Sequence, residues 1–300
     1  MRHRLFLTLS GLFFLIPLIG QQTMLFSVDY MTNNNVVQNI NSTVKQPALS
    51  PAVSFMSSWG IDATAMSSFI ANSDDSLKNF STETDFVLGY TWKISEHFSI
   101  YPSYTRFVFS RNSNAFNTMF RRDWRVDADY HNRIVSAGLT SGYLSGQQHT
   151  LYAMARNYYM ITLNKFLFRN AVLSIMPEAD LNFGNYEYLN LYYIEQLENY
   201  SGFYNYMLVY SKSLRRYVIS EMIRHPGKNG KEIINEYLEN KAQDSFKLTG
   251  LSLSLPVTYT IGNFGINAGL YIMLPMNQPD YLSGDPLVYF DAGVSYSFDF

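Results

Sequence analysis

The last seven residues of the chain, VSYSFDF, alternate strictly between large apolar and small polar side chains. Successive side chains of a β-strand point to opposite faces, so this segment as a strand has one greasy face and one polar face. The apolar face consists of Val294, Tyr296, Phe298 and Phe300. The polar face consists of Ser295, Ser297 and Asp299. Such a strand separates two different environments.

The composition indicates that one of these environments is lipid. Only 15% of the 300 residues are charged and 16% are aromatic, whereas an average chain has about 25% charged residues. The formal net charge of −2 gives no basic field for a nucleic-acid partner. The absence of cysteine excludes disulfides, a lipid-anchored cysteine and a cysteine-based metal site.

The first twenty residues have the layout of a secretory signal peptide. Arg2, His3 and Arg4 form a basic start, an apolar stretch covers 5–19, and Gly20 precedes Gln21, where we expect cleavage. The alternative is an N-terminal membrane anchor, which Pro17 and the short apolar run disfavour, because a spanning helix needs about 20 apolar residues. No later stretch approaches that length.

A chain that crosses a bilayer without helices must do so as a closed β-barrel, since every backbone polar group has to be paired. Segments of about ten residues with alternating polarity are typical of barrel strands. We expect strands at 23–31, 48–56, 60–69, 85–94, 98–111, 120–130, 133–143, 150–162, 171–183, 246–261, 264–275 and 288–300.

The connections between these segments support twelve strands, with ten or fourteen as alternatives because the first three are weakly patterned. Short turns are expected near 57–59, 95–97, 131–132, 163–169 and 262–263. Longer connections are expected at 32–47, 70–80, 112–119, 144–149, 184–245 and 276–286. This alternation is typical of outer-membrane barrels, whose periplasmic turns are short. A secreted β-sandwich is the alternative fold, but it would not need an aromatic face on nearly every strand.

The stretch FDAGVSYSFDF resembles the terminal strand of bacterial outer-membrane β-barrels. The residues that carry the resemblance are Gly293, Tyr296, Phe298 and Phe300. It implies a location in the outer membrane of a Gram-negative bacterium and recognition by the barrel-assembly machinery. Together with LSLPVTYTIGNFGINAGLYIMLPMNQP, this stretch is similar to uncharacterised barrels of the Bacteroidota type, over roughly the last 55 residues.

One expected strand has an unusually charged inner face. Its inward residues are Arg121, Asp123, Arg125, Asp127 and Asp129, and the strand at 171–183 adds Glu178 and Asp180. Charges in a barrel wall must face water or one another, so we expect them to line the lumen. They form either a selective constriction or a salt-bridged plug. Twelve strands lie between the filled eight-stranded barrel and the sixteen-stranded aqueous channel.

No motif for catalysis, metal binding or cofactor binding is present, so we expect no catalytic residue, no metal and no cofactor. His131 and His149 lack a serine at useful spacing, and Asp129 with His131 falls at the periplasmic end rather than the outer rim. An outer-membrane hydrolase is the remote alternative.

The segment at about 187–245 lacks strand alternation and is too long for a plain loop. Apolar spacing at Leu191, Ile194 and Leu197, and again at Leu214, Val218 and Met222, predicts helices, with Pro226, Gly227 and Gly230 breaking the run. We expect an extracellular helical hairpin that is either a lid on the rim or a device for partner recognition or gating.

The sequence therefore predicts a signal peptide at 1–20 and an all-β outer-membrane barrel at 21–300 that contains this insertion. The expected function is a narrow pore or transport-related barrel with a charged lumen. The alternative is a non-conducting structural or surface-interaction barrel that acts through the insertion. Outer-membrane lipid, the barrel-assembly machinery and an extracellular partner are the expected contacts.

Overall fold

The computed structural model describes residues 22–32, 36–37, 40–41, 47–71, 80–110, 120–132, 136–146, 149–185, 212–241, 246–277 and 286–300. The expected signal peptide and the first helical segment of the insertion, at 191–197, lie outside these residues.

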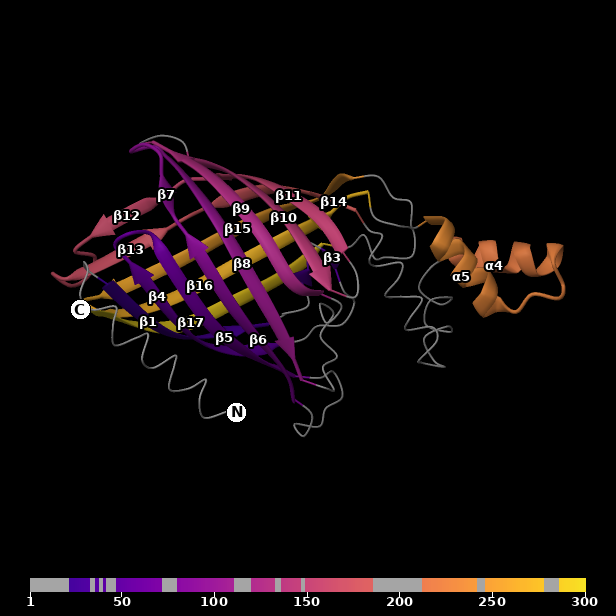
Figure 1. Cartoon of the computed structure of the whole chain (residues 1–300), viewed down its shortest axis with the longest axis horizontal. Coiled ribbons are helices and arrows are strands. Elements are labelled where there is room, and N and C mark those ends of the chain that lie inside the picture. The colour runs from indigo at the N-terminus through magenta and orange to yellow at the C-terminus, as the bar shows by residue number, and fades with distance from the viewer. Residues whose placement is uncertain are drawn as a thin grey trace.

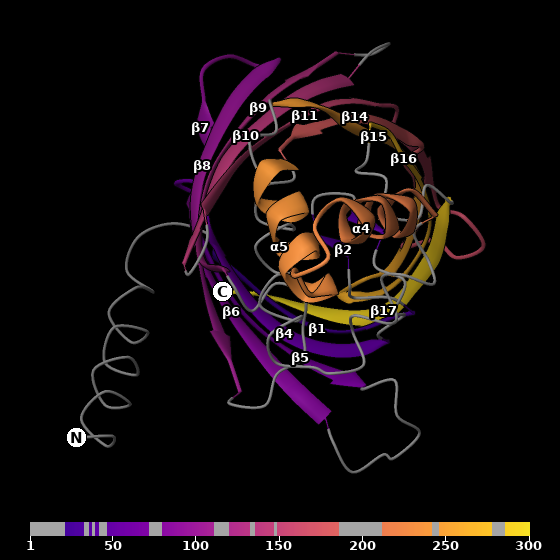
Figure 2. The same cartoon turned by 90° about the vertical axis from the view of Figure 1, so that its right-hand side faces the viewer.

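The strands form one antiparallel sheet that closes on itself (Figures 1 and 2). They are β1 (Gln22–Met31), β4 (Ala48–Ser57), β5 (Ile61–Ala71), β6 (Phe80–Tyr90), β7 (Trp92–Lys93), β8 (Phe98–Phe109), β9 (Phe120–His131), β10 (Ser136–Gly146), β11 (His149–Tyr158), β12 (Ile161–Asn164), β13 (Ala171–Ile175), β14 (Glu178–Gly184), β15 (Lys247–Ile261), β16 (Phe264–Pro275) and β17 (Leu287–Asp299). A separate small hairpin joins β2 (Val36–Val37) to β3 (Ile40–Asn41). Closure comes from β1, which pairs with β4 on one edge and with β17 on the other.

Three pairs of successive strands, β6 with β7, β11 with β12 and β13 with β14, are each one interrupted strand, so the barrel has the twelve strands that the sequence predicts. Gly89 of β6 pairs with Ser103, and Trp92 of β7 continues the same register at Ile100. In the same way, β12 and β13 continue the pairing of β11 with β14. Pro177 interrupts the ladder between β13 and β14 because proline has no N–H to donate.

One expected connection is wrong. The long connection predicted at 144–149 is only the two residues 147–148, because β10 extends to Gly146 and β11 begins at His149. Ser145 and His149 still pair across the two strands. Their small or polar side chains break the apolar alternation, so the sequence pattern ends before the hydrogen-bonded ladder does.

The outer surface of the barrel is apolar and aromatic, as the alternation predicts. On β17, Phe290, Val294 and Phe298 are about half exposed, while Gly293 and Asp291 of opposite parity face the interior. On β9, Trp124 and Val126 are exposed on the outer side. This surface has the character that a bilayer requires of a barrel exterior.

The two ends of the barrel differ. The turns β4–β5, β7–β8, β12–β13 and β15–β16 gather at one end together with Phe300, and we call it the short-turn end (Figure 1). Gly60 and Gly262 adopt positive φ angles of 95° and 57° in two of these turns, a conformation that glycine tolerates. The insertion between β14 and β15 emerges at the opposite, long-loop end.

The insertion contains the expected helical hairpin, with α4 (Lys212–Arg224) and α5 (Gly230–Lys241), beyond the long-loop end (Figure 1). The helices bury Val218, Ile233 and Ile234, whereas Met222, which has the spacing of the same helical face as Val218, is exposed. Asn229 Oδ1 accepts from the N–H of Glu232 at 3.0 Å, and the Glu232 carboxylate accepts from the N–H of Asn229, a capping box that starts α5. Neither helix is long and apolar enough to cross a membrane.

The closing seam between β1 and β17 includes a glycine, Gly293, that other atoms approach closely. Gln22 and Phe300 exchange backbone hydrogen bonds at 3.1 and 3.0 Å at the short-turn end of the seam. Further along, Gly293 pairs with Asp29, and the side chain of Asn267 reaches over it to donate to Asp29 Oδ1 at 2.9 Å. A Cβ on Gly293 would lie 2.0 Å from that oxygen and 2.9 Å from the backbone oxygen of Val28.

Replacing Gly293 with alanine is therefore expected to strain the seam. We expect Gly293→Ala to lower the free energy of unfolding by about 1–3 kcal/mol, the usual range for overpacking. Urea titration of the barrel in detergent micelles, followed by tryptophan fluorescence, measures this change. Gly227→Ala is the control, because a Cβ there meets nothing within 4 Å. Equal stability of the two variants contradicts the expected role of Gly293.

Candidate functional site in the barrel lumen

A buried carboxylate organises the charged wall of β9. Asp127, which is 3% exposed, accepts from Arg125 Nε and Nη2 at 2.7 and 2.8 Å and from the Thr140 hydroxyl at 2.5 Å. Arg156 of β11 adds contacts to Asp127 at 3.2 Å and to Asp129 at 3.4 Å. We call these five residues the Asp127 cluster; charge-assisted, two-pronged arginine–carboxylate pairs are among the stronger polar contacts in proteins.

The strand geometry explains how the cluster forms. The two-residue period of β9 places Arg125, Asp127 and Asp129 on its inner face, and Thr140 of β10 lies directly opposite Asp127. Gly138 separates Asp129 of β9 from Arg156 of β11 and pairs with both. A Cβ on Gly138 would lie 2.6 Å from Asp129 Oδ1, so the Arg156 side chain can cross β10 only because this position is glycine.

Elsewhere on the interior wall, other long side chains also cross over a glycine to reach an aspartate two strands away. Tyr101 of β8 lies over Gly89 of β6 and donates to Asp62 of β5 at 2.6 Å. Tyr152 of β11 lies over Gly142 of β10 and donates to Asp123 of β9 at 2.8 Å.

Asn267, Gly293 and Asp29 repeat the arrangement at the seam. With Arg156, Gly138 and Asp129, this makes four arrangements, which we call glycine bridges. In each, a side chain lies along the wall rather than toward the barrel axis and joins three strands.

The structure places the sequence-predicted lumen residues in different surroundings. Arg121 lies at a bulge near the long-loop end, with its guanidinium 5.1 Å from the centre of the Phe109 ring, and is not part of the Asp127 cluster. Asp123 accepts the hydrogen bond of the Tyr152 hydroxyl in one of the glycine bridges. Glu178 and Asp180 lie on the inner face of β14.

Sequence reasoning missed Arg156, Thr140, Tyr101 and Tyr152, which complete the cluster and the bridges. Alternation in 150–162 places Tyr152 and Arg156 on one face, but no sequence signal shows that they reach two strands away.

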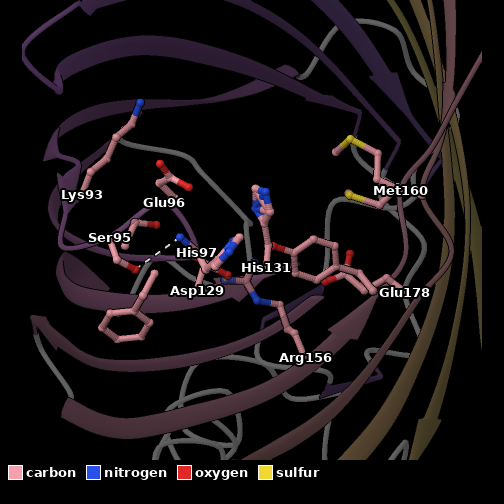
Figure 3. A pocket seen from close by; sticks show the side chains of 13 residues that line it. Lys93, Ser95, Glu96, His97, Asp129, His131, Arg156, Met160 and Glu178 are labelled. Carbon is pink, nitrogen blue, oxygen red and sulfur yellow. Dashed lines mark hydrogen bonds and ion pairs between the residues drawn. The ribbon is translucent and has the colours of Figure 1, made fainter. Parts of the chain in front are cut away.

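A cavity of about 770 Å³ opens inside the barrel at the short-turn end (Figure 3). It is lined by acidic and basic side chains and two methionines: Lys93, Glu96, His97, Asp129, His131, Arg156, Met160, Met176 and Glu178 among them. The ring centre of His97 lies 6.4 Å from that of Tyr130 and 6.5 Å from that of His131, both in edge-to-face geometry. The Asp129–His131 pair thus lies in the lumen at the short-turn end, where the sequence places it, and not at the outer rim.

Acidic side chains dominate the interior wall of the described strands. The inward carboxylates are those of Asp29, Asp62, Glu83, Asp85, Asp123, Asp127, Asp129, Glu178, Asp180, Asp291 and Asp299. The inward cationic side chains are Lys93, Arg121, Arg125, Arg156 and Lys247. Within the described part of the chain, no group of three or more His, Asp or Glu side chains has the arrangement of a metal site.

Comparison with known proteins gives no family for this chain. No family model matches it, and no curated protein matches it. Solved structures with similar folds include the KdgM porin, with a TM-score of 0.46 and 9% identity over 92% of this chain and 99% of that chain.

Two further structures are similar at the same level. An outer membrane channel from Pseudomonas putida F1 has a TM-score of 0.45 and 8% identity over 93% of this chain and 96% of that one. LpxR from Salmonella typhimurium has a TM-score of 0.46 and 8% identity over 91% of this chain and 99% of that one. Likeness at this level supports no inference about substrate or activity, and membership of a Bacteroidota-type family stays a prediction.

Neutralising Asp127 is expected to destabilise the barrel. Asp127→Asn leaves two arginines around a buried amide, and removing one partner of a buried ion pair costs about 3 kcal/mol or more. Urea titration in detergent micelles measures the loss. Asp299→Asn is the matched control, because Asp299 is exposed and its contact with Thr23 needs only an acceptor oxygen. A loss no larger than that of the control means that the cluster adds little to stability.

Proposed function

We propose that this chain is an outer-membrane β-barrel that forms a narrow pore for small polar solutes and prefers cations. The observation that carries the proposal is the acid-rich interior wall, enclosed by an apolar, aromatic exterior. The proposal assigns no catalytic residue.

The charge distribution explains the preference for cations. Carboxylates that line a cleft with low-dielectric walls concentrate ions of opposite charge, and rings of acidic side chains make a pore cation-selective. Arg125 and Arg156 are held against Asp127 and Asp129, so their charges are largely compensated within the cluster. Carboxylates elsewhere on the wall, such as Glu178 at the cavity, then set the sign of the interior.

The direction of the lumen side chains favours an open pore over a salt-bridged plug. The glycine bridges and the Asp127 cluster tie neighbouring strands laterally, along the wall. The cavity of about 770 Å³ is many times the roughly 30 Å³ that one water molecule occupies in the liquid. A hydrated ion or a small solute therefore has room beside the wall.

The two unlike ends support an orientation. Outer-membrane barrels have short periplasmic turns, so the short-turn end with Phe300 faces the periplasm and the helical hairpin faces outward. Tyr296, Phe298 and Phe300 are exposed on the outer surface at that end, where an aromatic girdle is expected. Recognition of these residues and Gly293 by the barrel-assembly machinery remains part of the proposal.

A second candidate function, protein recognition at the cell surface, is favoured by α4. Ile219, Met222 and Ile223 lie three and four residues apart on one side of this helix and are exposed by 53%, 44% and 74%. An amphipathic helix with such a stripe is suited to insertion into an apolar groove of a partner.

The pore predicts ion-selective current from the purified chain in planar lipid bilayers. Glu178→Gln is expected to lower the cation-to-anion permeability ratio about tenfold, and Lys93→Gln to raise it. One charge a few ångströms from a passing ion in water changes the energy of that ion by about 0.7 kcal/mol, with opposite sign for a cation and an anion, so the ratio changes by about 1.4 kcal/mol. Both residues line the cavity, so the variants are matched. The reversal potential in a KCl gradient measures the ratio. A folded barrel that carries no current either as the intact chain or without residues 187–245 overturns the pore.

Deletion of 187–245 separates the two candidate functions. If the hairpin serves only partner recognition, we expect unchanged single-channel conductance and loss of cell-surface partner capture. Current that appears or rises only after deletion makes the hairpin a gate. A folded barrel that is silent with and without the hairpin leaves surface recognition as the function.

A further inference from the structure

Two arginines stand out on the lipid-facing side of the barrel. Arg106 of β8 and Arg122 of β9 are direct partners in the ladder, two residues beyond the outward pair of Tyr104 and Trp124. They share the parity of that pair, so both side chains leave the wall on its outer side. Among the outward strand positions that the structure describes, these two are the only Asp, Glu, Lys or Arg side chains.

The arrangement is unfavourable for the protein by itself. Like charges directly opposite each other on one face of a sheet repel, and a guanidinium that faces lipid loses hydration. Every carboxylate on the described strands points inward, so no acidic strand residue compensates Arg106 or Arg122 on the outer face. Their charges therefore call for an anion supplied from outside the chain.

The neighbouring side chains define the character of the site. The ring of Tyr104 packs 4.5 Å from that of Trp124, toward the middle of the barrel from the arginines. Phe86 lies beside Arg106, and Ser145 lies beside Arg122 in the next ladder. Two aromatic rings with two arginines next to them suit a lipid, because its apolar body can lie against the rings while its polar headgroup meets the arginines.

The position along the barrel selects the leaflet. Arg106 is near the end of β8 and Arg122 near the start of β9, so the pair lies close to the long-loop end. In the proposed orientation, this is the level of the outer-leaflet headgroups. Phosphates carried on a sugar are available there, and two guanidinium groups can each bind a phosphate through paired N–H donors.

We propose that Arg106 and Arg122 form a binding site for a phosphate of an outer-leaflet glycolipid, with Tyr104 and Trp124 against the apolar part of the same molecule. The inference rests on the proposed orientation and membrane location, and not on pore activity. Its function is to fix a lipid at the β8–β9 wall, behind the Asp127 cluster.

Binding of a diphosphorylated glycolipid to the full barrel in zwitterionic phosphatidylcholine nanodiscs tests this site. The dissociation constant is measured for wild type and for the double variant Arg106→Gln/Arg122→Gln, with a fully dephosphorylated glycolipid and phosphatidylglycerol as comparison ligands. We expect at least tenfold weaker binding by the double variant, and weak binding of both comparison ligands by wild type.

Lys165→Gln/Arg169→Gln is the matched control, because it removes the same charge from an exposed turn at the short-turn end. It should bind the glycolipid as wild type does. Equal losses in both double variants, or equal binding of phosphatidylglycerol, indicate general attraction to anionic lipid and overturn the site. Circular dichroism confirms that both variants are folded, and conductance of the same samples reports on the pore separately.

Discussion

Pairing of the β1 and β17 edges is the interaction on which the rest of this structure depends. A sheet in lipid cannot leave an open edge, because no water is present to satisfy its N–H and C=O groups. Here β1 meets β17 in register from Thr23–Asp299 to Met31–Asp291. The ring that results creates the two surfaces on which all functional inferences rest: an apolar exterior and a polar interior.

The interior of this ring is organised by small residues as much as by charged ones. At Gly89, Gly138, Gly142 and Gly293, the missing side chain lets a long one from the next strand lie along the wall. The bridging hydrogen bonds end on aspartates, so the same residues that give the lumen its negative character also hold neighbouring strands together. Stability and electrostatics are therefore coupled in this barrel, and Asp127 belongs to both.

The exterior of the described strands is free of Asp, Glu, Lys and Arg side chains except at two arginines. A barrel exterior without charge needs only an apolar neighbour, whereas the opposed Arg106 and Arg122 call for a negatively charged one, which we propose is a lipid phosphate. The Asp127 cluster lies on the inner side of the same β8–β11 wall. One wall of the barrel thus concentrates charge on both of its surfaces, while the wall formed by β15, β16 and β17 has an exterior of aliphatic and aromatic residues.

The sequence by itself determined the barrel and which side of β9 or β17 lies on its outer surface, because alternation with a period of two is a local property of each strand. It favoured twelve strands over ten or fourteen, and the pairing of the strands decided for twelve. It also indicated a helical hairpin, through the helical spacing of Leu214, Val218 and Met222 and the break that follows at Pro226 and Gly227. Only the tertiary structure decided that Arg156 reaches Asp127 across Gly138 and that Arg106 opposes Arg122. Those meetings depend on the register between strands, and a slip of one residue would turn every side chain to the other face.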